Sequence, residues 1–234
     1  ACIYKNLDKP NVAVFGDSHA VEMAFALAYI PENRNIGVQH FSYSGCPPST
    51  QGFNSSKCQR WTDNVVDYIS LSPTIKNVVI SYRIAYHLHG EVAGTYPDLP
   101  NEKTNEEITQ ILSAYTSIVE KFKSADKNVI VAVQAPEIPF SMREYNRDIA
   151  NGLVNNSKNV LGFSIEYWDK RINKFLAHLQ TISDIHIVNP SDHFCEKSDC
   201  FAIKNGKAFY FDNDHMSTYG ASLVATEITS FIKK

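Results

Sequence analysis

Short apolar runs alternate with longer amphipathic stretches along this chain. Five of the runs are rich in β-branched residues and bounded by turn-forming residues, a pattern typical of strands that are buried on both faces. We expect these strands at residues 11–15, 35–41, 77–82, 128–133 and 185–188.

The stretches between these runs have helical spacing. In 105–124 the apolar residues recur every three or four positions, which predicts an amphipathic helix. We also expect helices after Ser18, at 61–71, at 165–179 and from Ser217 to about 232, with an extended piece at 207–211 and a long loop at 85–101. Strands alternating with helices favour one domain over 1–234: a three-layer α/β/α sandwich with a mostly parallel, five-stranded sheet in flavodoxin-like order.

Composition excludes several classes of protein. Of the 234 residues, 44% are hydrophobic and 20% charged, so we expect a packed core rather than disorder. The formal net charge is -3 without a basic stripe, so no nucleic-acid partner is expected. No apolar run is long enough for a membrane span, and no signal peptide is visible. Because the chain begins at Ala1 rather than Met, we expect a mature product or an excised soluble domain.

Four of the five cysteines form two locally spaced pairs, Cys46 with Cys58 and Cys195 with Cys200. Disulfides at these pairs would indicate an oxidising compartment. Buried free thiols and a metal site are the alternatives, but the close spacing of a zinc site is missing, so no metal is expected. Cys2 is left without a local partner.

The first candidate for chemistry follows the first strand, in Gly16-Asp17-Ser18-His19. Ligands of parallel α/β sheets bind beyond the carboxyl ends of the strands. A serine at such a strand-to-helix turn can present its hydroxyl to a crevice, where helix N–H groups favour negative charge. We expect Asp17 to brace the turn rather than to take part in chemistry.

A base for Ser18 is expected near the other end of the chain, in the segment 210–217. Asp212 lies three residues before His215, so its carboxylate can fold back onto the imidazole and hold the tautomer. Asp214 competes for this role, but an immediate neighbour has difficulty reaching the ring. His87 and His89 could bind a metal, and the alternative is a solvated pair in a loop.

The two motifs together, Gly-Asp-Ser-His at 16–19 and Asp-x-x-His at 212–215, resemble the SGNH hydrolase superfamily. The Ser-Gly-Cys-Pro-Pro loop at 44–48, an arginine after the third strand and the ending YFDNDHMSTYGA are similar to one subgroup. Its members are the periplasmic SGNH domains fused to acyltransferase-3 membrane domains in bacterial surface-glycan O-acetyltransferases.

The resemblance implies a role for each matching residue. Ser18 matches the nucleophile, His215 the general base and Asp212 its orienting carboxylate. The backbone N–H groups of Ser18 and Gly45 match donors of the oxyanion hole. The superfamily's asparagine after the third strand is replaced by Arg83, which could donate to the oxyanion or bind substrate.

His19 is a further candidate for substrate contact, with packing against the last loop as the alternative. The resemblance implies an O-acetyltransferase that acetylates a sugar hydroxyl of a glycan such as lipopolysaccharide O-antigen, without a cofactor of its own. The acetyl donor would come from an acyltransferase-3 membrane domain or indirectly from acetyl-CoA, at the periplasmic face of the membrane. The alternatives are a secreted carbohydrate acetyl esterase and an inactive glycan-binding module.

Overall fold

The computed structural model describes residues 2–5, 9–31, 36–50, 56–92 and 95–233. Residue 35, at the start of the second predicted strand, residues 51–55 between Cys46 and Cys58, and residues 93–94 of the predicted loop lie outside the described residues.

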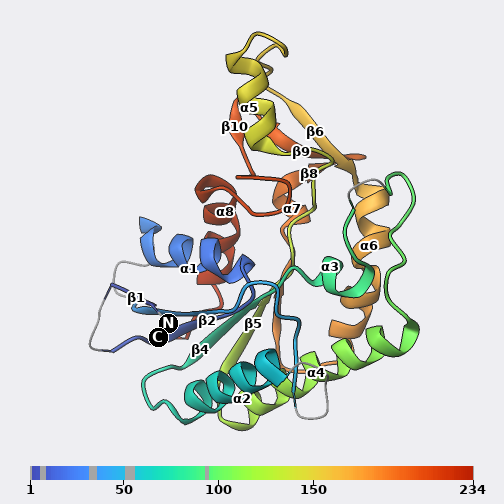
Figure 1. The fold of residues 1–234 in the computed structure, drawn as a ribbon. Coiled ribbons are helices and arrows are strands. Elements are labelled where there is room, and N and C mark those ends of the chain that lie inside the picture. Colours follow the sequence, from blue (N-terminus) through green and yellow to red (C-terminus); the bar gives the residue numbers. More distant parts are fainter. Residues whose placement is uncertain (1, 6–8, 32–35, 51–55, 93–94, 234) are drawn as a thin grey trace.

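The core of the fold is a six-stranded sheet in the order β1-β3-β2-β4-β5-β7. Figure 1 labels β1, β2, β4 and β5 of this sheet. Its strands are β1 (Cys2–Tyr4), β2 (Val12–Gly16), β3 (Val38–Ser42), β4 (Asn77–Ser81), β5 (Asn128–Ala132) and β7 (His186–Val188). All pairs are parallel except that of the edge strand β1 with β3. The predicted α/β fold is confirmed, including the five parallel strands in flavodoxin-like order; β1 was not predicted.

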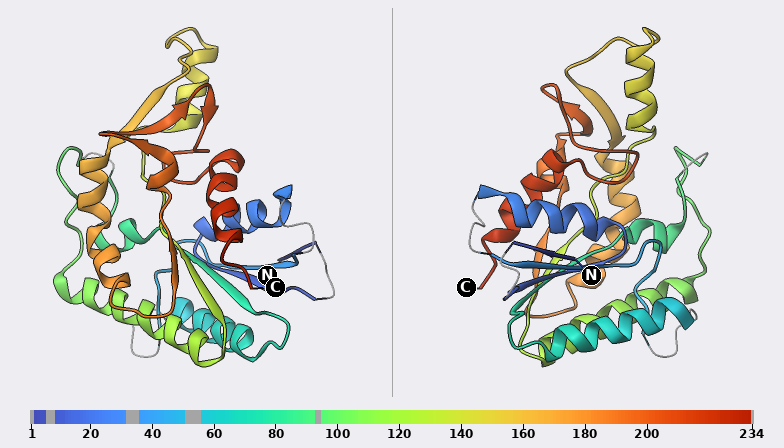
Figure 2. Two further views of the ribbon diagram at one scale, coloured as in Figure 1. Left: turned by 180° about the vertical axis from the view of Figure 1, so that it is seen from behind. Right: turned by 60° about the vertical axis from the view of Figure 1, so that its left-hand side comes forward.

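Helices cover both faces of this sheet (Figure 2). The side chains of β2 alternate between two hydrophobic clusters, with Val12 and Val14 in one and Ala13 and Phe15 in the other. The first cluster includes α1 (His19–Tyr29) and α8 (Thr218–Thr229), and the second includes α2 (Ser56–Leu71), α4 (Asn105–Ser124) and α6 (Ile165–Leu179). This alternation explains why the strands read as continuous apolar runs.

Two parts of the structure differ from the predictions. The segment 85–101 was predicted to be a loop, but it contains most of α3 (Ile84–His89), whose Ile84, Ala85 and Leu88 are buried. A second sheet and α5 (Met142–Ala150) were not predicted. This sheet contains β6 (Val160–Ser164), β8 (Cys195–Glu196), β9 (Asp199–Lys204) and β10 (Lys207–Ala208), and α7 (Ser191–Phe194) lies directly before β8.

The turn that carries Ser18 depends on the absence of a side chain at Gly16. A Cβ atom there would lie 1.7 Å from the backbone oxygen of Ser81 on β4, a contact that backbone movement alone can relieve. We expect Gly16→Ala to lower the free energy of unfolding by about 4 kcal/mol. Gly152→Ala is the control, since its Cβ meets nothing within 4 Å, and strain at its φ of 72° should cost only about 1 kcal/mol. Urea denaturation of the two variants checks this, and equal losses would contradict it.

Candidate active site

Ser18 occupies the N-cap position of α1, at the carboxyl end of β2. Its hydroxyl makes no capping hydrogen bond, because the Asp17 carboxylate takes that role. The His19 N–H donates to Asp17 Oδ1 at 3.0 Å, and the Arg83 N–H donates to Asp17 Oδ2 at 2.9 Å. Asp17 therefore braces the turn, and the Ser18 hydroxyl is left available to another partner.

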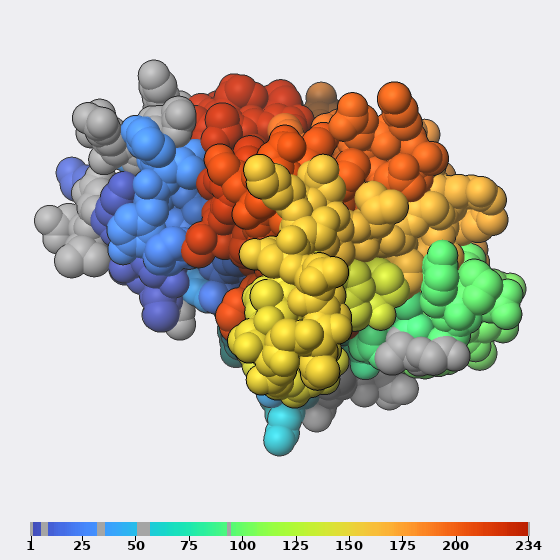
Figure 3. Space-filling model, turned by 90° about the horizontal axis from the view of Figure 1, so that it is seen from above, coloured from blue at the N-terminus to red at the C-terminus, as the bar shows by residue number. Residues whose placement is uncertain are grey.

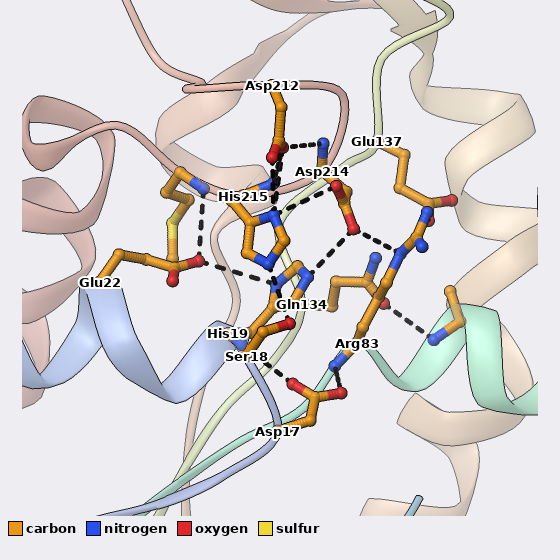
Figure 4. Close-up of polar contacts among 12 residues, drawn as sticks. Asp17, Ser18, His19, Glu22, Arg83, Gln134, Glu137, Asp212, Asp214 and His215 are labelled. Atoms are coloured by element: carbon orange, nitrogen blue, oxygen red, sulfur yellow. Dashed lines mark hydrogen bonds and ion pairs between the residues drawn. The ribbon is translucent and has the colours of Figure 1, made fainter. Parts of the chain in front are cut away.

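That partner is His215, 2.9 Å from Ser18 Oγ through Nε2 (Figure 4). The other ring nitrogen, Nδ1, lies 2.9 Å from Asp212 Oδ2 and 3.2 Å from Oδ1. The backbone N–H of His215 also donates to Asp212 Oδ1, at 2.8 Å. With Nδ1–H donated to Asp212, Nε2 is the acceptor that faces the serine hydroxyl, the arrangement required of a general base.

The loop that carries these two residues is held at both ends. Tyr210 and Met216 form an isolated β-bridge across its base, and the Tyr210 hydroxyl donates to the Pro136 carbonyl. The Ile138 N–H donates to the Asn213 carbonyl at 2.9 Å. The segment between β5 and α5 therefore supports the loop that carries Asp212 and His215. This segment also connects α5, which was not predicted, to the site.

The backbone N–H groups of Ser18 and Gly45 are free to bind a developing oxyanion. Gly45 and Ser18 line one small chamber, and neither N–H donates to any other residue that the structure describes. Gly45 has a φ of 72°. The next residue, Cys46, is buried and disulfide-bonded to Cys58 of α2, so the loop is anchored beside the chamber. Backbone donors fixed in this way can stabilise a tetrahedral intermediate.

Behind His215 lies a buried layer of charged groups. The His19 ring stacks on the His215 ring with centroids 4.5 Å apart. Asp214 bridges the two rings, with Oδ2 3.3 Å from His19 Nε2 and Oδ1 3.4 Å from His215 Nδ1. The expectation that Asp214 has difficulty reaching the imidazole is therefore wrong, since the loop turns its carboxylate back toward the ring.

The structure places His19 and Arg83 differently from the roles expected of them. His19 is 1% exposed, and its position fits packing behind His215 rather than contact with substrate. Arg83 lines the chamber, but three carboxylates already bind its guanidinium. Its Nε lies 2.6 Å from Asp214. Its Nη1 and Nη2 both pair with Glu91, and Nη2 also pairs with Glu137. Arg83 is thus a fixed cation that holds Asp214 rather than a free donor for an oxyanion or a substrate.

His87 and His89 do not form the solvated pair considered above. Both are buried in α3, and His87 Nε2 lies 2.9 Å from Asp17 Oδ2. One group of potential metal ligands occurs among the described residues: His19, Asp214 and His215, with ligand atoms within 4.8 Å of one another. The Arg83 guanidinium beside Asp214 already supplies positive charge there, so this cluster is a poor site for a cation.

Glu22 is a site residue that the sequence interpretation missed, although a helical i, i+4 spacing places it beside Ser18. Its carboxylate accepts the Met216 N–H at 3.4 Å and lies 3.8 Å from His19 Nδ1. Burial raises the pKa of Glu22 to about 7. Glu22 thus adds a further carboxyl group to the lining around Ser18, and this group is largely protonated below neutral pH.

The surroundings of His215 predict an alkaline activity profile. Burial alone would lower its pKa, but the hydrogen bonds to Asp212 and Asp214 outweigh burial and raise the pKa to about 10. A general base acts in its neutral form, and the neutral fraction grows as pH rises toward that pKa. We expect kcat/KM for a small acetyl ester to keep rising above pH 7.5, and a profile that declines from pH 6 to 9 would contradict this assignment. Initial rates in constant-ionic-strength buffers measure it.

The carboxyl-edge position, the serine–histidine–aspartate geometry and the free N–H groups are the features that acyl transfer through a serine requires of an α/β protein. The family model "SGNH domain (fused to AT3 domains)" matches residues 1–230, and the chain belongs to this family.

The comparison with solved structures supports the same fold. The periplasmic domain of a lipopolysaccharide acetyltransferase from Salmonella ser. Paratyphi A superposes with a TM-score of 0.65 at 15% identity, over 94% of this chain and 83% of that chain. Est24, a carbohydrate acetylesterase from Sinorhizobium meliloti, gives 0.53 at 13% identity, over 95% and 97%. The aryl esterase of M. smegmatis gives 0.52 at 11%, over 95% and 100%. No curated protein sequence matches the chain.

Proposed function

We propose that this chain is an O-acetyltransferase that moves an acetyl group through an ester on Ser18 to a sugar hydroxyl of a bacterial surface glycan, such as lipopolysaccharide O-antigen. The observation that carries the proposal is the line of contacts from Ser18 Oγ through His215 to Asp212, with distances of 2.9 Å on both sides of the ring. A line of this kind activates a hydroxyl that is otherwise a weak nucleophile.

The reaction takes place in two steps. Ser18 Oγ attacks the carbonyl carbon of the acetyl donor while His215 accepts the hydroxyl proton, and the N–H groups of Ser18 and Gly45 hold the oxyanion. His215 gives the proton to the leaving group, and an acetyl-serine remains. The incoming sugar hydroxyl then gives its proton to His215 and attacks the acetyl carbon. The bond to Ser18 breaks, and His215 returns the proton to Ser18 Oγ.

The chamber beside Ser18 supports a short acyl group. Its volume is about 230 Å³, and Asp17, Arg83, His87 and Asp214 contribute ionisable side chains to its wall. A long hydrocarbon chain would desolvate these groups without replacing their hydrogen bonds, at a cost in free energy. An acetyl group avoids this cost.

The family description names a fusion to AT3 domains, which supports an acyltransferase-3 membrane domain as the partner. In this proposal that domain supplies acetyl, directly or from acetyl-CoA, and this chain needs no cofactor of its own. The disulfides Cys46–Cys58 and Cys195–Cys200 support an extracytoplasmic location, such as the periplasmic face of the inner membrane. Among the described residues, no helix combines the length and the apolar character that a membrane crossing needs.

A carbohydrate acetyl esterase is the second candidate, and the exposure of the site favours it. The His215 side chain is 29% exposed, so water can approach the base that would activate a sugar hydroxyl. The same contacts therefore serve hydrolysis when no acceptor occupies the site.

One experiment separates the two candidates. The chain is incubated with p-nitrophenyl acetate, with and without a purified O-antigen oligosaccharide, and ester cleavage and oligosaccharide mass are followed together. Acetylated oligosaccharide that disappears in Ser18→Ala supports transfer, whereas Ser18-dependent cleavage with unmodified sugar supports the esterase. If the wild type cleaves the ester no faster than Ser18→Ala does, the transferase and the esterase are both ruled out, and the glycan-binding module remains.

A further inference from the structure

A second, larger hollow opens on the other side of Ser18 and His215. It is a cleft of about 770 Å³ between α1, the loop 209–218 and α5. Seen from above, the orange-red chain of this loop lies between the blue α1 and the yellow α5 (Figure 3). Ser18 and His215 line both the cleft and the small chamber, so the reacting atoms lie where the two hollows meet.

The two hollows suit different parts of a reacting ester. Ser18 and Gly45, whose backbone N–H groups donate to no other described residue, both line the chamber, which suits the carbonyl oxygen and its acetyl group. The group that leaves, or the hydroxyl that arrives, must exchange a proton with His215. His215 and its partner Asp212 both line the cleft, so the cleft is where the alcohol part of the ester fits.

The outer wall of the cleft combines aromatic faces with polar side chains. Phe25 on α1 is 42% exposed and Phe211 is 55% exposed, and both line the cleft. The Arg143 guanidinium stacks on Phe211 at 4.5 Å from the ring centroid. Asn146 lies three positions further along α5 and lines the same wall. An apolar acyl chain placed here would bury Arg143 and Asn146 without partners, whereas a sugar offers both a C–H face and hydroxyl groups.

We propose that this cleft is the acceptor subsite of the enzyme and binds one saccharide unit, with its ring against Phe211 and its hydroxyl groups on Arg143 and Asn146. The inference rests on the proposed function, because it assigns the alcohol side of the same reaction. Arg143 and Asn146 belong to α5, whose first residue Met142 donates its N–H to the Asp212 carbonyl at 3.4 Å. The acceptor wall is thus attached to the loop that carries Asp212.

The test uses leaving groups of two sizes, because the sugar of a sugar acetate must occupy the acceptor subsite when its ester is cleaved. Vinyl acetate is the small probe, and mono-O-acetylated methyl glycosides of glucose, galactose, rhamnose and N-acetylglucosamine, which keep their other hydroxyl groups free, are the sugar probes. For each protein the measured quantity is kcat/KM for the sugar acetate divided by kcat/KM for vinyl acetate.

We expect this ratio to fall at least 10-fold in the double variant Arg143→Ala, Phe211→Ala for at least one glycoside that the wild type cleaves. Arg147→Ala is the matched control, because Arg147 lies on the same helix with its side chain 64% exposed and does not line the cleft. Its ratio should stay at the wild-type value.

Two results would overturn the subsite. One is a ratio that changes less than 3-fold in the double variant for every glycoside, and the other is a wild type that cleaves vinyl acetate but no sugar acetate. Absence of Ser18-dependent cleavage of vinyl acetate would instead contradict the proposed function itself, so the two failures are distinguishable.

Discussion

Ser18→Ala should lower kcat for acetyl-ester cleavage by about 10⁴- to 10⁶-fold, because it removes the hydroxyl that becomes acetylated in the proposed mechanism. The Ser18 hydroxyl contacts His215 Nε2 and does not cap its helix, so its loss should leave the fold almost unchanged. Steady-state rates with p-nitrophenyl acetate, alongside thermal unfolding of the same preparation, measure both effects.

A covalent probe strengthens this test. A fluorophosphonate should label the wild type at Ser18, as seen by peptide mass, and should not label the alanine variant. Ser217→Ala is a suitable comparison, since Ser217 also lines the cleft but its hydroxyl donates to the Ala208 carbonyl and accepts the Gly220 N–H. Retention of wild-type turnover by Ser18→Ala would refute the assigned nucleophile.

The parts of the fold that the sequence predicts well are those in which local pattern and burial agree. The spacing of apolar residues in 105–124 predicts both ends of α4 correctly, and Thr104 with Glu107 forms a capping box at its start. The strands of the parallel core read as apolar runs because helices cover both faces. The residues of the site lie at the ends of such elements, so Ser18 and His215 could be singled out before their distance was known.

The parts that could not be predicted depend on contacts between distant segments. Segment 85–101 has no clear apolar period, and the helix within it forms where His87 meets Asp17. The second sheet consists of short, half-exposed strands such as β6, with Leu161 50% exposed, which give a weak pattern. The network of Arg83 with Glu137 brings together residues 54 positions apart. Sequence spacing carries no signal for such a pairing. The sequence alone therefore leaves Arg83 as a candidate oxyanion donor.

Asp214 raises the question of which carboxylate orients His215. The Nδ1–H of the imidazole can make one strong hydrogen bond, and Asp212 Oδ2 at 2.9 Å is closer than Asp214 Oδ1 at 3.4 Å. Asp214 is also held by Arg83 and His19. Burial opposes its ionisation, but the hydrogen bonds to His19 and His215 and the charge of Arg83 hold the pKa of Asp214 well below its usual range. We therefore propose that Asp214 stabilises the positive charge that develops on His215, while Asp212 holds the tautomer.

These different roles predict different kinetics for two otherwise matched variants. Asp212→Asn should lower kcat by about 10³- to 10⁴-fold, because an amide can donate to Nδ1 and favour the tautomer that protonates Nε2. Asp214→Asn keeps the Asp212 contact and should lower kcat by only about 10-fold, while lowering the apparent pKa of the kcat/KM profile because one of the negative charges near the imidazole is lost. The pH profiles of both variants with vinyl acetate measure this difference. A larger loss in Asp214→Asn than in Asp212→Asn, at equal folded fraction, would reverse the assignment and make Asp214 the orienting carboxylate.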